Sequence, residues 1–248
     1  MRKLIYGYNR IWLSLKNMNL YNNVKVVIPA FNEAANIALV INDIPPQLCT
    51  EVIVTNNNST DNTAAIAKQC NATVLLEPTP GYGIACLKAL DYIRQTGGCD
   101  VVVFVDADYS DYPSEMAQLL APIQLNTADM VIGARVKKLR AVGSMTPQQI
   151  FGNWLAVFLI NLFYKHQFTD LGPFRAITWQ ALESLQMVDK NYGWTVEMQI
   201  KAIKKNLRCT EIPVKYRNRN GGVSKVSGSL KGSVLAGIKI IKTIFKYA

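Results

Sequence analysis

Short apolar runs alternate with segments of helical periodicity through the first half of the chain. Between the runs, apolar residues recur every three or four positions, as they do from Ile37 to Ile44. Strands that alternate with helices in this way predict an α/β fold, in which helices cover both faces of a mostly parallel sheet. The expected strands are 24–30, 51–55, 72–77, 101–105 and 129–133.

The second half of the chain has a less regular pattern. Residues 150–164 are apolar on nearly all sides but fall short of the roughly 20 residues that cross a bilayer, which predicts a buried or interfacial helix. We expect its aromatic residues Trp154, Phe158 and Phe163 in the core, with a lipid-binding groove as the alternative. The remaining expected elements are a strand near 174–178, helices near 179–186 and 195–206, a strand near 209–216, a basic glycine- and serine-rich loop over 217–229, and a helix over 230–247.

The length of 248 residues suits one large domain with elaborated ends. We therefore divide the chain into a basic amphipathic segment 1–22, a central domain 23–228 and a basic amphipathic helix 229–248. In the last helix Ile238, Ile241 and Phe245 share one side and lysines largely occupy the other. No segment reaches the length of a membrane span, and charged residues interrupt the N-terminus too often for a signal peptide.

Composition narrows the classes of function. Half of the residues are hydrophobic and 18% are charged, so a sizeable core is expected. The net charge of +10 is uneven, because 199–248 holds twelve Lys or Arg and one acid, which indicates a polyanionic partner. A nucleic acid is disfavoured as the partner because the sequence has no basic recognition helix. A dinucleotide cofactor is disfavoured because no Gly-x-Gly-x-x-Gly motif follows the first strand. Five irregularly spaced cysteines and one histidine predict reduced thiols, a cytoplasmic location and no zinc site.

Polar residues gather where the expected strands end. These segments are Pro29–Glu33, Asn56–Asn58 and Asp106–Asp108, and ligands of parallel sheets bind beyond the carboxyl ends of strands. Asp106 and Asp108 follow the most apolar strand. Two carboxylates so placed suit Mg²⁺ or Mn²⁺ bridging a diphosphate, although a polar strand end or a helix cap would also explain them.

Several motifs in order resemble the family 2 glycosyltransferases, which have the GT-A fold. They are Ile28-Pro29-Ala30-Phe31-Asn32-Glu33, Asn58-Ser59-Thr60-Asp61-Asn62-Thr63 and Asp106-Ala107-Asp108. The segments 170–175 and 217–225 are similar to the branch that contains the dolichyl-phosphate and polyprenyl-phosphate mannosyl- and glucosyltransferases. The resemblance covers about residues 24–230.

The resemblance implies roles for individual residues. Asp106 and Asp108 would hold the metal and the donor diphosphate, and the turn at Gly81 and Gly83 would pass close to the nucleotide. The donor-binding set would be Pro29, Ala30, Glu33, Asn57, Gly81 and Gly83. The chain departs from the family at Asn56 and Asn57, where an aspartate is usual, and at Ser110, where some relatives have a glutamine next to the metal.

A set of basic and polar residues is expected to bind phosphate. The planar guanidinium of arginine matches the oxygens of a phosphate, and Gly221-Gly222 lets a loop fold over an anion. The alternatives to phosphate binding are solvated surface charge and structural ion pairs. The resemblance assigns this loop to the acceptor phosphate or the donor diphosphate. The candidates are Arg135, Arg175, Arg217, Arg219, Ser224 and Lys225. Glu197 is either a functional residue, as a catalytic base or an acceptor contact, or a surface helix residue paired with Lys201.

The residues and the resemblance together predict a metal-dependent glycosyltransferase with a UDP- or GDP-linked donor, and the resemblance implies that the reaction inverts the anomeric centre. A lipid phosphate is favoured as the acceptor because the later part of the chain is poor in bases and rich in Arg and Lys. The terminal segments are basic and apolar, which predicts that the protein contacts the anionic surface at the inner face of the membrane. A saccharide hydroxyl acceptor and a non-catalytic relative that binds nucleotide or membrane are the alternatives.

Overall fold

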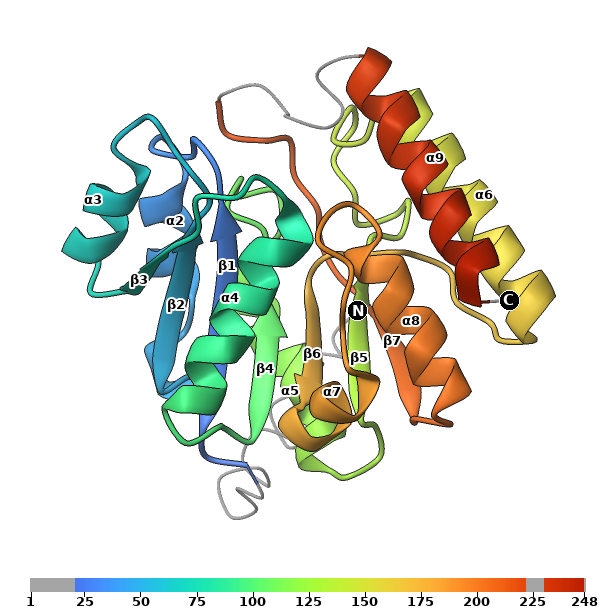
Figure 1. The fold of residues 1–248 in the computed structure, drawn as a ribbon, viewed down its shortest axis with the longest axis horizontal. Helices are drawn as coiled ribbons and strands as arrows, with labels where there is room; N and C mark the ends of the chain where they lie inside the picture. Colours follow the sequence, from blue (N-terminus) through green and yellow to red (C-terminus); the bar gives the residue numbers. More distant parts are fainter. Residues whose placement is uncertain (1–20, 222–229, 248) are drawn as a thin grey trace.

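A computed structural model of the chain shows one seven-stranded sheet with helices on both faces (Figure 1). The structure describes residues 21–221 and 230–247, and the side chains of the latter segment from Ala236. All seven expected strands are present: six lie within one residue of their predicted limits, and the strand expected near 209–216 ends three residues early, at Pro213. The strands are β1 (Val24–Ala30), β2 (Glu51–Asn56), β3 (Thr73–Leu76), β4 (Val101–Phe104), β5 (Met130–Ala134), β6 (Arg175–Thr178) and β7 (Cys209–Pro213).

The strands lie in the order β3-β2-β1-β4-β6-β5-β7, and the sheet is mixed rather than wholly parallel. Only β6 runs against its neighbours β4 and β5. Its first residue, Arg175, pairs with Phe104 at the end of β4, so the chain enters β6 at the edge where β4 leaves the sheet. The segment before β6 therefore returns along the carboxyl ends of the parallel strands, where a site is expected.

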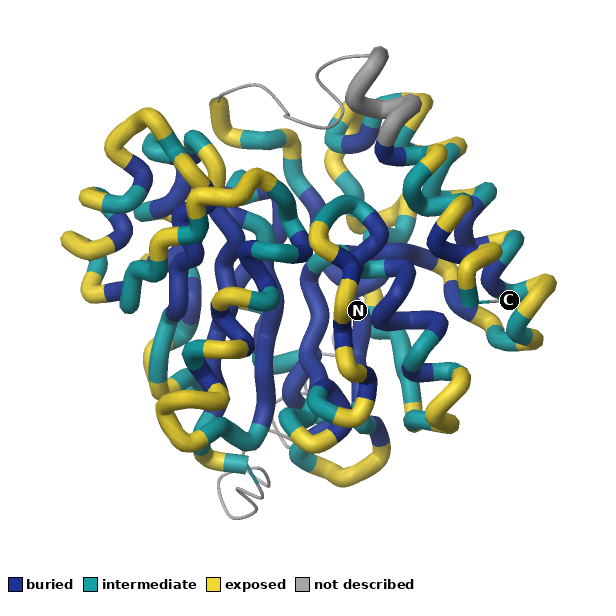
Figure 2. The backbone as a smooth tube through the Cα atoms, viewed as in Figure 1, coloured by how far each residue is buried: buried dark blue, intermediate teal, exposed yellow. Residues whose placement is uncertain are grey.

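Helices cover the sheet as two layers. The core between α2, α3, α5 and the sheet contains Val26 and Val103, whereas Val27 and Phe104 point into the core on the side of α4 and α8. This alternation along buried strands gives the dark band in Figure 2. The helices are α2 (Ile37–Asp43), α3 (Thr63–Gln69), α4 (Tyr82–Gln95), α5 (Met116–Gln124), α6 (Pro147–Tyr164), α7 (Trp179–Leu185), α8 (Trp194–Lys204) and α9 (Leu230–Tyr247), with short 3₁₀ turns at Pro46–Leu48 and Pro113–Glu115.

Helix α6 lies at the β7 end of the molecule and corrects one expectation. Ala156, Val157 and Ile160 bury one side of the helix. Trp154 and Phe158, expected in the core, are 58% and 49% exposed, and Phe163 is exposed as well. A helix that is apolar on all sides buries only the side that its neighbours cover, and α6 stands at the margin of the fold (Figure 1).

Helix α9 runs beside α6 and α8 (Figure 1), and the Tyr164 hydroxyl donates to the carbonyl oxygen of Ile244 over 2.7 Å. Ala236, Thr243 and Ile244 form its buried side, whereas Ile238 and Phe245 are exposed. The apolar side that the sequence singled out is thus largely turned away from the protein. Among residues 21–221 and 230–247, no helix is both long enough and apolar enough to cross a membrane. The proposed segment 1–22 lies almost wholly outside the described residues.

Candidate active site

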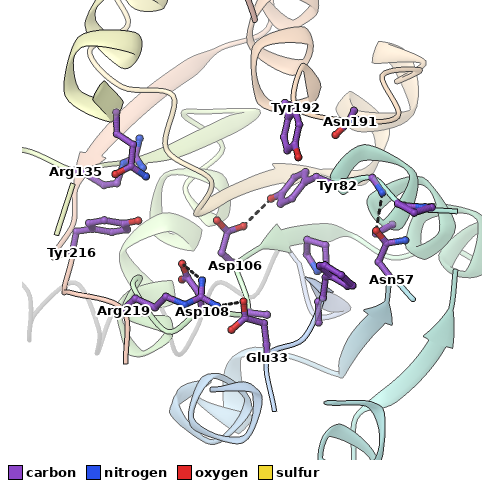
Figure 3. A pocket seen from close by; sticks show the side chains of 18 residues that line it. Glu33, Asn57, Tyr82, Asp106, Asp108, Arg135, Asn191, Tyr192, Tyr216 and Arg219 are labelled. Atoms are coloured by element: carbon purple, nitrogen blue, oxygen red, sulfur yellow. Dashed lines mark hydrogen bonds and ion pairs between the residues drawn. The ribbon is translucent and has the colours of Figure 1, made fainter. Parts of the chain in front are cut away.

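A cleft of about 460 Å³ opens at the carboxyl ends of β1, β2, β4 and β5 (Figure 3). Motifs that are far apart in the sequence meet there, because parallel strands end at one edge of the sheet. The predicted residues that line it are Pro29, Ala30, Glu33, Asn57, Gly81, Asp106, Asp108, Arg135 and Arg219. The structure thus brings the metal, donor and part of the phosphate candidates into one cavity.

Asp106 and Asp108 follow the end of β4 and both face the cleft. The Tyr82 hydroxyl donates to Asp106 Oδ1 over 3.0 Å, and the backbone N–H of Ser110 donates to Asp108 Oδ1 over 3.0 Å. Burial, followed by the charge of Asp108, raises the pKa of the Asp106 carboxyl to about 7. Holding two carboxylates together in a half-buried cleft is unfavourable, and a cation would relieve that cost.

The donor atoms of this pair suit Mg²⁺ or Mn²⁺. Such ions take oxygen ligands, and Mg²⁺ is commonly bound by one or two carboxylates, with water and substrate phosphates completing the set. In the part of the chain that the structure describes, no group of three His, Cys, Asp or Glu side chains could form a complete cage. Ser110 is buried and does not line the cleft. Asp106 and Asp108 therefore fit an ion that is shared with a bound diphosphate.

Arg219 crosses the cleft from the segment after β7. Its guanidinium forms an ion pair with Glu33 and lies 3.4 Å from Asp108 Oδ2 (Figure 3). Glu33 is fixed in turn, because the Asn36 side-chain amide donates to its carboxylate over 2.8 Å. The arrangement places one positive charge beside the acidic pair, where a diphosphate would need it.

Arg135, just after β5, is held by Asp170. Two side-chain hydrogen bonds of 2.7 and 2.8 Å join them, and the Arg135 backbone N–H adds a third of 2.8 Å. Burial alone would raise the pKa of the Asp170 carboxyl, but the charge and hydrogen bonds of Arg135 outweigh it, and the pKa is lowered. The guanidinium lies over the Tyr216 ring at 5.3 Å and lines the cleft. Arg135 is thus a rigidly oriented cation at the wall of the site.

Two predicted phosphate ligands lie elsewhere. Arg175 is fully buried and donates to the carbonyl oxygens of Gly172 and Thr195, so it braces the turn into β6. Arg217 stacks between two tyrosine rings, 3.5 and 3.7 Å from their centroids, and donates to the Asp111 carbonyl oxygen. Neither residue lines the cleft. The other two candidates, Ser224 and Lys225, lie outside the described residues.

Asn57 has a structural task that an aspartate could not perform. Its side-chain amide donates to the carbonyl oxygens of Glu77 and Thr79 over 3.0 and 2.6 Å, and its carbonyl accepts from the Gly81 N–H over 2.8 Å. A carboxylate has no proton to donate at neutral pH and would face two carbonyl oxygens. The departure from the usual aspartate thus accompanies a loop that is tied to the end of β2.

The glycines at the start of α4 serve a close approach within the protein. A Cβ atom on Gly83 would collide with the Asp189 carbonyl oxygen, and one on Gly81, whose φ is +149°, would collide with that of Lys190. The Ile84 N–H also donates to the Lys190 carbonyl oxygen over 3.0 Å. Gly81 lines the cleft and Gly83 does not. The absence of side chains at these two glycines therefore lets the backbone at 189–191 approach the start of α4.

That backbone belongs to a loop which sequence reasoning did not assign to the site. Asn191 and Tyr192 line the cleft, and Asp189 shapes the loop by accepting from the N–H groups of Asn191 and Gly193. Loop residues with no regular pattern gave no signal in the sequence. Tyr82 and Tyr216 were not named as site residues either, although Tyr82 lies in the expected turn between Gly81 and Gly83 and Tyr216 ends the expected strand 209–216.

Glu197 supports the same loop. It is fully buried in α8, accepts from the backbone N–H groups of Val188 and Asp189, and pairs with Lys201 at 2.7 Å. The Tyr247 hydroxyl of α9 donates to it over 2.6 Å. Of its two sequence-based interpretations, the geometry agrees with the pair with Lys201, in a buried rather than a surface setting. A carboxylate with these partners is not placed to take a proton from a substrate.

A second, side cavity of about 320 Å³ adjoins the cleft between α6 and the segment after β5. Arg135 lines both cavities. On one wall the side cavity has Lys137 and Arg140, and on the other Ile150 and Trp154 of α6. It therefore combines a cationic wall with an apolar one.

Comparisons with known proteins agree with this geometry. The profile of Glycosyl transferase family 2 matches residues 25–184. An uncharacterized glycosyltransferase of Mycobacterium tuberculosis is 33% identical over 223 residues, 89% of this chain and 97% of that one. An undecaprenyl-phosphate mannosyltransferase of Micrococcus luteus is 28% identical over 87% of this chain and 92% of its own. The fold matches glucosyl-3-phosphoglycerate synthase of M. tuberculosis, 22% identical, with a TM-score of 0.76 over 94% of this chain and 82% of that one.

Proposed function

The chain belongs to Glycosyl transferase family 2, and from that premise we propose that it transfers a sugar from a UDP- or GDP-linked donor to a lipid phosphate. The observation that carries this proposal is that Asp106 and Asp108 open into the same cleft as Arg135 and Arg219. An acidic pair flanked by arginines is suited to a nucleoside diphosphate and its counterion.

The residues of the cleft divide the work of transfer. A divalent ion held by Asp106 and Asp108, Mg²⁺ or Mn²⁺, would supply positive charge to the departing diphosphate. Arg219 adds charge from the opposite wall, and Tyr82 orients Asp106 through its hydroxyl. Solved complexes of the structural relative glucosyl-3-phosphoglycerate synthase contain Mn²⁺ and uridine diphosphate, which is consistent with this division.

The choice of acceptor rests on the bases that the cleft offers. Among the described lining residues, the carboxylates are Glu33, Asp106 and Asp108. Glu33 is paired with Arg219, and the other two are assigned to the metal. A hydroxyl acceptor needs a base to remove its proton, whereas a phosphate is already ionised near neutral pH and needs only cations to position it. Arg135 meets that need.

Relatives support the same class of acceptor. The M. luteus mannosyltransferase is named for undecaprenyl phosphate, and a 29% identical polyprenol monophosphomannose synthase of Mycolicibacterium smegmatis covers 82% of this chain. The matches cover 92% and 81% of the relatives' own lengths.

A panel of donors and acceptors tests the proposal. Purified protein is incubated with UDP- and GDP-sugars and either polyprenyl phosphate or soluble saccharides, with Mn²⁺ or with EDTA. We expect sugar in the lipid fraction only with metal, and none after Asp108→Ala. If sugar were transferred to saccharides alone, the proposed lipid acceptor would be wrong. If no donor were turned over in a metal-dependent way, the protein would be a non-catalytic relative.

A further inference from the structure

One side of α6 presents a continuous apolar stripe to solvent. Its residues are spaced by three or four positions, so they line up along the helix. Phe151 and Leu162 are 61% and 58% exposed, and the ring of Trp154 stacks on Phe158 with centroids 5.8 Å apart. Contiguous exposed apolar surface of this kind marks a contact with another apolar phase or partner. We call Phe151, Trp154, Phe158 and Leu162 the aromatic face.

The aromatic face continues onto α9. Near its end, Phe163 packs edgewise against Phe245 at 5.2 Å between ring centroids. Phe245 is itself exposed, and so is Ile238 on the same helix. The two helices, which lie together at one end of the molecule (Figure 2), therefore share an apolar outer surface.

Positive charge surrounds this surface. Residues 135–169, which include all of α6, contain no Asp or Glu; the exposed Lys137 lines the side cavity with Ile150 and Trp154, and the exposed Lys165 follows the last residue of α6. Lys242 and Lys246 are exposed on α9. Aromatic residues framed by lysines match the boundary of an anionic bilayer, where rings enter the head-group region and ammonium groups meet lipid phosphates. A second copy of the chain would bring the same positive frame against itself.

The aromatic face also leads to the catalytic cleft. Trp154 belongs both to this face and to the wall of the side cavity, and Arg135 belongs both to the side cavity and to the cleft. An amphiphile with its tail on the aromatic face could thus place an anionic head group beside Lys137 and Arg140. A soluble acceptor would have no use for the exposed rings.

We propose that the aromatic face is the surface on which this protein rests on an anionic lipid bilayer, with the side cavity open to lipid head groups. The identity of the head group as acceptor rests on the proposed function, whereas the docking itself does not. In this orientation the acceptor reaches Arg135 from the membrane side while the donor enters the cleft from water.

Vesicle binding tests the proposal without reference to activity. The full chain is sedimented with vesicles of phosphatidylglycerol and phosphatidylcholine, or of phosphatidylcholine alone. The test variant is Trp154→Glu with Phe158→Glu, and the matched control is Leu125→Glu, which charges an exposed apolar residue at the end of α5. Circular dichroism and binding of nucleoside diphosphate with Mn²⁺ report whether the fold and the donor site are intact in each variant.

We expect wild type and Leu125→Glu to bind the anionic vesicles equally and more tightly than the neutral ones. The double variant should bind at least about a hundredfold more weakly, because each of the two buried rings contributes roughly 1.4 kcal/mol or more, which is a factor of about ten. Equal vesicle binding by the double variant would overturn the proposal. So would a concentration-dependent dimer that the double variant abolishes. If the protein bound vesicles but transferred no sugar to lipid, the proposed acceptor would be wrong and the proposed docking surface would still hold.

Discussion

Replacing Asp106 by Asn separates the stability of the site from its function. Burial and the charge of Asp108 raise the pKa of the Asp106 carboxyl from its ordinary value of 3.8 to about 7. At about 1.4 kcal/mol for each pKa unit, the ionised carboxylate costs the native state as much as about 4 kcal/mol. A neutral amide avoids that cost and can still accept from the Tyr82 hydroxyl. We therefore expect Asp106→Asn to stabilise the metal-free protein and to abolish metal-dependent transfer.

The gain in stability should depend on pH. Because the folded pKa is above the unfolded one, the native state binds more protons between pH 3.8 and about 7, and wild-type stability falls as pH rises through that window. The Asp106→Asn variant lacks this pH-dependent contribution to stability. Its advantage should be close to zero below pH 3.8, about 2 kcal/mol at pH 5 and as much as about 4 kcal/mol at pH 8.

Urea unfolding in EDTA at pH 5 and pH 8 measures the difference, with Asp108→Asn as the control. The Asp108 carboxylate is 24% exposed and pairs with Arg219, so its removal should bring no comparable gain. Both variants should lose at least about a hundredfold in transfer, since each removes a carboxylate that we propose as a ligand of the metal. An Asp106→Asn protein that is no more stable than wild type at pH 8, or equally stabilised at both pH values, would refute this reasoning.

Four further substitutions test residues in and near the site. Asn57→Asp removes two donated hydrogen bonds and should lower the free energy of unfolding by about 1–3 kcal/mol in urea titrations while raising KM for the donor more than it lowers kcat. Tyr82→Phe removes a hydrogen bond that lowers the pKa of Asp106, so the midpoint of Mn²⁺ binding, followed by calorimetry against pH, should move to higher pH. Arg219→Gln should raise donor KM at least about tenfold with little change in stability, whereas Arg217→Gln should lower the melting temperature and leave donor KM unchanged; the reverse pattern would contradict the assigned positions.

Most of the fold could be predicted from the sequence because its signals are local. An apolar run such as 101–105 has few alternatives to a buried strand, and the chain order of strands and helices limits the topology. The reversed direction of β6 could not be predicted in this way. It depends on where the chain re-enters the sheet after α6, which is a long-range property of packing.

The candidate site was predictable only where residues follow strand ends. Asp106 and Asp108 meet Glu33 because parallel strands terminate together. Arg175 and Arg217 look like phosphate ligands in the sequence, but whether an arginine faces a cleft or the interior depends on tertiary partners that no local pattern reveals.

The exposure of α6 could not be predicted from the sequence for a related reason. A helix that is apolar all round can be enclosed by protein or can present one side to another phase, and periodicity does not distinguish these outcomes. Only the placement of α6 at the margin of the fold, next to α9, shows that Trp154 and Phe158 are exposed.

The most direct measurement of the central claim is a calorimetric titration of UDP and GDP into the protein, with Mn²⁺ and with EDTA, for wild type and Asp108→Ala. The account predicts binding of one nucleotide that requires Mn²⁺ and is lost in the variant. Equal affinity in EDTA, or in the absence of the Asp108 carboxylate, would contradict the claim that this acidic pair holds the ion for a nucleoside diphosphate.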